Sequence, residues 1–163
     1  MSKAEHARFT ALVETARRYC ALIDEAPVKP DWLLGLFRLL PELHAAVVAL
    51  RDPGGGPVAP EGADFEARFN LFTRLRRHLG DRDRYWLEYD DPGDTAGDHR
   101  TGSLADDLTD IYFELRRGLE LLDAAGPKEA AHLWEAGFEQ HWGQHLVDAE
   151  RQLYALKVND RLM

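Results

Sequence analysis

The sequence is poor in cysteine, and this absence limits the chemistry that the chain can support. Cys20 is the only cysteine among 163 residues, so the chain cannot form an internal disulfide, and a zinc site built from several cysteines is excluded. Cys20 lies on the apolar face of a predicted helix, and no residue near it in the sequence would activate its thiol. We therefore expect a buried structural cysteine rather than a catalytic nucleophile.

Long apolar runs and an excess of basic residues are missing as well. No apolar stretch approaches the length of a membrane-spanning helix, and the initial sequence, MSKAEHARF, is too polar for a signal peptide. The chain carries 20 lysines and arginines against 29 acidic residues, which gives a formal net charge of −9. Nucleic acids and anionic membranes bind cationic surfaces, so we expect neither as a partner, and we expect a cytoplasmic protein.

Strand-like alternation bounded by turn residues is also absent, and the apolar residues instead recur at helical spacing. The pattern predicts an all-α protein with one domain over residues 1–163, a helical bundle of five or six helices. The first helix begins at a capping box formed by Ser2 and Glu5 and ends near Glu25.

The middle of the chain contains the residues that bend or end helices. Pro41 cannot donate a helical hydrogen bond, so it either kinks the second helix or starts a further one. A helix over residues 65–79 is closed by Gly80. Residues 52–62 and 90–101 are rich in glycine, proline or acidic side chains, and we expect exposed loops there.

Two long amphipathic segments, residues 102–122 and 127–157, end the chain and are joined by the short sequence AAGP. Ser103 and Asp106 have the spacing of a capping box at the start of the first segment. Two helices joined by so short a turn form a C-terminal antiparallel helical hairpin. With a rise of about 1.5 Å per residue on both helices, residues whose numbers sum to roughly 251 lie at the same level.

Acidic and histidine side chains on the facing sides of these two helices form the candidate site. The register places Asp107 near His145, and Asp110 near His141. The predicted group, called the polar cluster below, consists of Asp107, Asp110, Glu114, His141, His145 and Asp148.

The polar cluster has two interpretations. In the structural one, buried aspartates bond to histidines and fix the register of the helices, and neither a metal ion nor another cofactor is bound. In the chemical one, Asp107, Asp110, His141 and His145 hold a metal ion, because histidines at i and i+4 with carboxylates from a facing helix are how bundles build metal sites. We prefer the structural interpretation, because clusters of ionisable residues are often only structural.

Two further motifs carry less information. DDLTD, residues 106–110, matches the aspartate-rich motif of prenyl-diphosphate enzymes, but the chain is far shorter than those folds and has no second metal motif. RLRRHLGDRDR, residues 74–84, is locally basic, and its arginines could bind phosphate. Asp81 and Asp83 interrupt it, so we expect a solvated helix face with salt bridges to its neighbours.

A family resemblance extends over nearly the whole chain. The segments LLGLFRLLPELHAAVVAL, GDRDRYW, GSLADDLTDIYFELRRGL and FEQHWGQHLVDAERQLYAL resemble a family of small uncharacterised bacterial proteins catalogued as a domain of unknown function. The resemblance implies a small helical cytoplasmic protein of bacterial origin, and it assigns no activity and no catalytic residue.

These observations favour a non-enzymatic protein-interaction or regulatory module, with another protein as its partner. A surface patch of the aromatic residues Tyr85, Trp86 and Tyr89 would support this function. The alternative is a metal-dependent all-α hydrolase that acts on a nucleotide or other phosphate compound. Two or more residues of the polar cluster converging on an open cavity would support the hydrolase.

Overall fold

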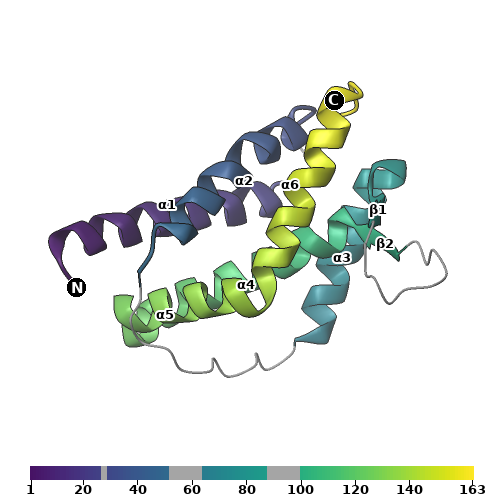
Figure 1. Ribbon diagram of the computed structural model, residues 1–163. Coiled ribbons are helices and arrows are strands. Elements are labelled where there is room, and N and C mark those ends of the chain that lie inside the picture. The colour runs from purple at the N-terminus through teal and green to yellow at the C-terminus, as the bar shows by residue number, and fades with distance from the viewer. Residues whose placement is uncertain (27–28, 52–63, 88–99) are drawn as a thin grey trace, which may run out of the picture.

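A computed structural model describes residues 1–26, 29–51, 64–87 and 100–163 (Figure 1). These residues form an all-α bundle, as the sequence predicted. The helices are α1 (Lys3–Asp24), α2 (Trp32–Val48), α3 (Phe65–Leu79), α4 (Leu104–Ala125), α5 (Pro127–Gly137) and α6 (Gly143–Val158). None of the helices in this described part is both long enough and apolar enough to cross a membrane.

Several helix ends lie at residues that cap or terminate helices. Ser2 and Glu5 form the predicted capping box at the start of α1. Gly80 follows α3 with a positive φ of 58°, a backbone conformation that glycine adopts at little cost. The hydroxyl of Ser103 accepts a hydrogen bond from the backbone NH of Asp106 at 3.2 Å and caps α4. The sequence therefore identified these three boundaries correctly.

Helix α2 contains Pro41 and continues through it to Val48. The proline therefore does not start a new helix. Of the two segments predicted to be loops, 52–62 lies wholly outside the described residues. Of the second segment, residues 90–99 also lie outside the described residues, and residues 100 and 101 belong to a strand.

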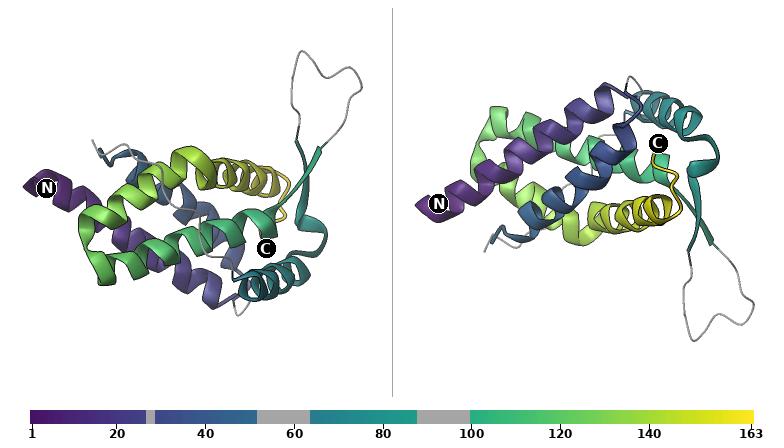
Figure 2. Two further views of the ribbon diagram at one scale, coloured as in Figure 1. Left: turned by 90° about the horizontal axis from the view of Figure 1, so that it is seen from below. Right: turned by 90° about the horizontal axis from the view of Figure 1, so that it is seen from above.

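A short β-hairpin contradicts the expectation that the chain contains no strand. β1 (Arg84–Leu87) pairs antiparallel with β2 (Arg100–Ser103), and Tyr85 lies opposite Gly102. Figure 2 shows the two strands leaving the helical body between the end of α3 and the start of α4. Strands of only four residues are too short for an alternating pattern to be recognised in a sequence.

The last predicted helix, residues 127–157, is interrupted by a π-helical segment, Phe138–Trp142, between α5 and α6. The backbone NH of Gly143 donates to the carbonyl of Phe138, five residues earlier, which is the bond that defines a π-helix. A Cβ atom on residue 143 would lie 2.4 Å from that carbonyl oxygen, so the segment requires glycine there. After it, α6 continues at a steep angle to α5 (Figure 1).

Helix α4 lies at the centre of the bundle and contacts α1, α3, α5 and α6. Its buried backbone carbonyls also accept bonds from aromatic side chains. The hydroxyl of Tyr19 donates to the carbonyl of Leu108 at 2.8 Å, and the indole NH of Trp134 donates to the carbonyl of Glu114 at 3.1 Å. Because α4 is covered on several sides, polar side chains that it directs at α6 are largely withdrawn from water.

Cys20 is buried in α1 with 5% of its surface exposed, as predicted. Burial raises the pKa of its thiol to about 12. The thiolate, which is the reactive form of cysteine, is therefore scarce at neutral pH.

Candidate functional site

Helix α4 places three carboxylates on the side that faces α6. Asp107, Asp110 and Glu114 are spaced three and four residues apart, so they lie on one face of the helix. Asp107 is 3% exposed and Glu114 is 8% exposed, and the side chain of Asp110 is 17% exposed. Carboxylates this deeply buried require partners.

The π-helical segment and the first turn of α6 place two histidines opposite these carboxylates. The rings of His141 and His145 meet edge to face, with their centroids 5.0 Å apart. The side chain of His145 is 19% exposed, whereas that of His141 is 51% exposed. One histidine is therefore held inside the cluster and the other borders solvent.

His145 lies between two carboxylates of α4. Its Nδ1 is 2.8 Å from Oδ1 of Asp107, and its Nε2 is 2.9 Å from Oδ2 of Asp110. The structure therefore joins Asp107, Asp110 and His145 of the polar cluster by direct hydrogen bonds. A ring that donates from both nitrogens is an imidazolium.

The pKa shifts in this network favour a cationic His145. Burial opposes the charge of His145, but its hydrogen bonds to Asp107 and Asp110 outweigh burial and raise its pKa to about 10. Burial raises the pKa of Asp107 to about 6, against the hydrogen bonds from His145 and Tyr85. For Asp110, burial is outweighed by the bond from His145 and the charges of His145 and Arg68, so its pKa lies below the ordinary value.

Two side chains from other elements hold the outer oxygens of the aspartates. The hydroxyl of Tyr85, on β1, donates to Oδ2 of Asp107. Nη1 of Arg68, on α3, donates to Oδ1 of Asp110 at 2.5 Å. A Cβ atom on residue 102 would lie 2.2 Å from the Tyr85 ring, so Gly102 in β2 makes room for the tyrosine.

The second histidine also has a carboxylate beside it. Nδ1 of His141 lies 3.6 Å from Oε1 of Glu114, which is an ion-pair distance but longer than a hydrogen bond. Each histidine therefore has its Nδ1 next to a buried carboxylate of α4.

Asp148, the last member of the polar cluster, is bonded elsewhere. It is 8% exposed and accepts a hydrogen bond from Nε2 of Gln144 at 3.2 Å. After burial and hydrogen bonding, its negative charge is a further influence that raises the pKa of Asp107. It acts on the histidine site through charge rather than contact.

Two groups of possible metal ligands share His145. One group is Asp110, His141 and His145, and the other is Asp106, Asp107 and His145. In each group the potential ligand atoms lie within 4.8 Å of one another. The first group includes the solvent-bordering His141, and the second includes the deeply buried Asp107.

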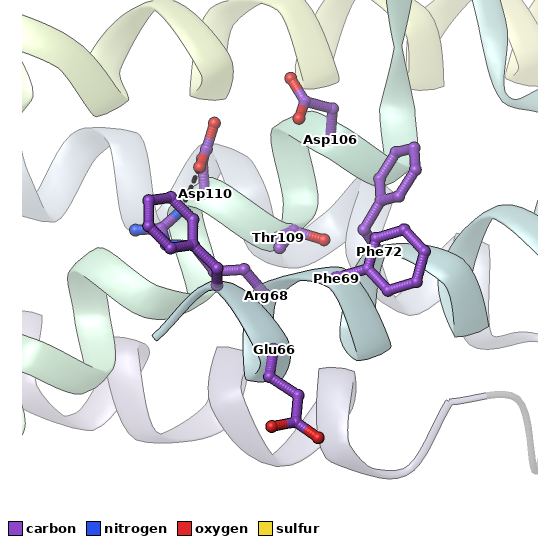
Figure 3. Close-up of a pocket in the computed structure, with 8 residues that line it drawn as sticks. Glu66, Arg68, Phe69, Phe72, Asp106, Thr109 and Asp110 are labelled. Carbon is purple, nitrogen blue, oxygen red and sulfur yellow. Dashed lines mark hydrogen bonds and ion pairs between the residues drawn. The ribbon is translucent and has the colours of Figure 1, made fainter. Parts of the chain in front are cut away.

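A cavity of about 580 Å³ adjoins this site (Figure 3). Phenylalanines and Arg68 of α3 line one side of it, and Asp106 and Asp110 of α4 line the other. Figure 3 shows Arg68 reaching across to Asp110. Asp110 therefore belongs both to the histidine site and to the cavity wall.

Three residues of the site were missed by sequence reasoning, and they are Arg68, Tyr85 and Asp106. Asp106 was visible in the DDLTD motif but was assigned only a role at the helix start. Tyr85 was expected in an aromatic surface patch instead, and Arg68 gave no signal, because the packing of β1 and α3 against α4 cannot be read from local periodicity.

Comparison with known proteins gives a family and a fold. A family model described as Domain of unknown function (DUF5063) matches residues 4–159. The chain is similar to the crystal structure of protein BF1032 from Bacteroides fragilis, with a TM-score of 0.73 and 22% sequence identity over 91% of this chain and 90% of the other. A likeness at this identity shows the fold alone. None of the curated proteins matches the chain in sequence.

Proposed function

The chain belongs to the family described as Domain of unknown function (DUF5063), and we propose that it is a metal-dependent hydrolase of a nucleotide or other phosphate compound. The metal ion is held by Asp110, His141 and His145. The observation that carries the proposal is the setting of His145, whose Nδ1 lies 2.8 Å from buried Asp107 while its Nε2 lies 2.9 Å from Asp110.

This setting is the one that metal-binding histidines usually have. A histidine that ligates a metal through one ring nitrogen almost always donates its other N–H to a carboxylate, a backbone carbonyl or water, which fixes the ring and makes the ligand more basic. Asp107 supplies that carboxylate to His145, and Glu114 lies beside the corresponding nitrogen of His141 at 3.6 Å. A hydrogen-bonded carboxylate at Nδ1 of His145 and a nearby carboxylate at Nδ1 of His141 support a metal ion shared by the two histidines.

The distances allow one ion to be bound with small movements. Two ligands bound tetrahedrally to zinc at about 2.0–2.1 Å lie roughly 3.3 Å apart. The 2.9 Å between Nε2 of His145 and Oδ2 of Asp110 is shorter than that by a few tenths of an ångström. His141 is half exposed, so its ring can rotate toward the ion. Two imidazoles and a carboxylate suit zinc or manganese.

Three protein ligands leave a coordination position open, as catalytic rather than structural zinc sites do. An ion held by Asp110, His141 and His145 would lower the pKa of a bound water molecule, so that hydroxide could attack a phosphorus centre while the P–O bond to the leaving group breaks and the leaving oxygen takes up a proton. The adjoining cavity gives a substrate access to Asp110, and the guanidinium of Arg68 on its wall is suited to a phosphate oxygen. These features support phosphate-ester hydrolysis rather than simple metal storage.

Metal binding must displace the proton that His145 carries in the metal-free protein. The ligand form of histidine is neutral, so metal uptake releases protons and strengthens as the pH rises. The hydrogen bond from Arg68 to Asp110 leaves Oδ2 of the aspartate to the ion. The existing network is therefore compatible with an ion between Nε2 and Oδ2.

Isothermal titration of metal-stripped protein with zinc or manganese chloride tests the metal site. Wild type should bind one ion, and His145→Ala and Asp110→Asn should lose that binding. His44→Ala is the matched control, because Nδ1 of His44 lies 2.7 Å from Oε1 of Glu150, a histidine–carboxylate pair outside the site. Wild type that binds no ion, or variants that bind it as well as His44→Ala does, would reject the proposal.

Hydrolysis tests the activity separately. Phosphate release from nucleotides and from p-nitrophenyl phosphate should require added metal, should stop with a chelator, and should fall at least about a hundredfold in Asp110→Asn. Arg68→Gln should weaken substrate binding while leaving the ion in place. If the protein binds the ion but releases no phosphate from any of these compounds, the proposed metal site stands and the proposed hydrolysis is wrong.

A second candidate function, protein interaction, is favoured by the exposed aromatic residues. Phe65 and Phe69 on α3 are 78% and 66% exposed, and Trp86 is 65% exposed. Large exposed apolar side chains on one helix are typical of a docking surface. Of the predicted patch, Tyr85 points to Asp107, and Tyr89 lies outside the described residues. A partner that cross-links to wild type and to His145→Ala, but not to a Phe65→Ser/Phe69→Ser variant, would support this function.

A further inference from the structure

A second cavity, of about 290 Å³, lies between the β-hairpin and the C-terminal part of α6. Arg84 and Trp86 of β1 line one side, and Arg151 and Asn159 line the other, with Arg161 of the chain end beside them. None of the proposed metal ligands lines this cavity. Among the described residues, only Tyr85 connects the cavity to the histidine site, because it lines the cavity and bonds to Asp107.

The secondary structure explains why these side chains meet. Successive side chains of a strand point to opposite faces, so Arg84 and Trp86 lie on the same face of β1. Both are exposed, whereas the intervening Tyr85 is partly buried and reaches Asp107. Arg151 lies in the C-terminal half of α6 and Asn159 is the residue that caps this helix, so both reach the cavity from the same end of α6.

The charge of this cavity is opposite to that of the whole chain. The chain has a formal net charge of −9, yet three arginines line this one cavity. The carboxylate that pairs with one of them is Asp81, 3.1 Å from Nη2 of Arg161, and its side chain is 90% exposed. Ion pairs between exposed side chains contribute little free energy, so a phosphate group can replace this one.

The shapes of the side chains indicate the ligand. Arginine forks bind phosphate oxygens in pairs of parallel hydrogen bonds. Trp86 offers a 65% exposed indole, and such a ring stacks well on a nucleobase. A cavity of about 290 Å³ is at the small end of ligand sites, so it suits one nucleotide rather than a folded segment of a protein. We propose that this cavity binds a nucleoside phosphate, with its phosphates on Arg84, Arg151 and Arg161 and its base on Trp86.

Calorimetric titration with ADP, in the presence of a chelator, tests this site independently of the metal site. ADP should bind to wild type more tightly than pyrophosphate, and adenosine alone should bind least, because the arginines supply most of the attraction. Arg151→Gln and Arg84→Gln should each weaken ADP binding roughly tenfold or more. Trp86→Leu should weaken ADP binding by a similar factor and leave pyrophosphate binding unchanged.

Arg38→Gln is the matched control, because Arg38 is an exposed arginine on α2, away from this cavity. It should bind ADP as wild type does. The other three tryptophans, Trp32, Trp134 and Trp142, are at most 3% exposed, so quenching of exposed indole fluorescence by ADP should disappear in Trp86→Leu. The proposal is overturned if wild type does not bind ADP at about 1 mM, or if the Arg84, Arg151 and Trp86 variants bind ADP as tightly as the control does.

Discussion

Asp107 is the side chain on which the geometry of the histidine site depends. It is 3% exposed, and its two oxygens contact the hydroxyl of Tyr85 and Nδ1 of His145. Because both oxygens have partners, the aspartate cannot turn without breaking one bond. The orientation of His145 is therefore set by a tyrosine on a different element.

Replacing Tyr85 by phenylalanine should destabilise the metal-free protein. The change removes a hydrogen bond to a buried carboxylate, and bonds to charged groups contribute about 1.5–3 kcal/mol. Urea unfolding of Tyr85→Phe should show a loss in that range. Tyr154→Phe is the control, because Tyr154 is 62% exposed, and it should lose almost nothing. Equal stabilities of the two variants would mean that the tyrosine does not position Asp107.

At the scale of elements, the π-helical segment decides which way the histidines point. It lies between α5, which packs on α4 through Trp134, and α6, which carries His145. The extra residue in its turn rotates the start of α6 relative to α5. His141 and His145 consequently both face the carboxylates of α4.

Replacing Gly143 by alanine should disturb this segment. The added Cβ would lie 2.4 Å from the carbonyl oxygen of Phe138, so the backbone must move, and overpacking of this kind costs about 1–3 kcal/mol. We also expect weaker zinc binding, because His141 and His145 would shift. Thermal unfolding and zinc titration of Gly143→Ala measure both effects.

Gly35→Ala provides the comparison for this substitution. Its Cβ would meet Leu22 at 3.5 Å, an ordinary contact, and α2 is helical around it. Alanine should therefore stabilise the protein by roughly 0.5–1 kcal/mol. A Gly143→Ala variant that gains stability in the same way would show that the π-helical segment is not required.

The helical periods predicted that Asp107 lies beside His145, but they did not predict that Asp110 also bonds to His145, at 2.9 Å, or that His141 lies 3.6 Å from Glu114. A short connection and a fixed rise per residue are local properties, and they placed His145 beside Asp107, 2.8 Å away in the structure. The π-helical segment depends on a bond between Gly143 and Phe138 that has no pattern of its own in the sequence. Tyr85 and Arg68 reach the site through the packing of β1 and α3 on α4, which is a long-range property.

At the scale of the whole molecule, the site is a small group of paired charges inside an acidic protein. The ionisable groups that face His145 are Asp106, Asp107 and Asp110 from α4 and His141 from the π-helical segment. Tyr85 from β1 lies beside Asp107, and Arg68 from α3 lies beside Asp110. Folding brings these groups together, so their protonation and the stability of the fold depend on each other.

The stability of the metal-free protein should fall as the pH rises from 7 to 9. The pKa of His145 is raised from 6.5 to about 10 by folding, so its contribution is complete below pH 6.5 and is lost as the pH rises toward the folded-state pKa. The slope is at most about 1.4 kcal/mol per pH unit. Urea unfolding in the presence of a chelator should show this slope in wild type and a flatter one in His145→Gln. Parallel slopes would mean that folding does not shift the pKa of His145.

The most direct test of the central proposal is a crystal structure of protein grown with zinc or manganese, with the ion located by its anomalous scattering. We expect one ion bound to Nε2 of His145, to His141 and to Oδ2 of Asp110 at about 2.0–2.2 Å, with Nδ1 of His145 still bonded to Asp107. An ion absent from this position at saturating metal, with His145 bonded to both aspartates as in the metal-free protein, would contradict the proposal and leave the polar cluster a structural network.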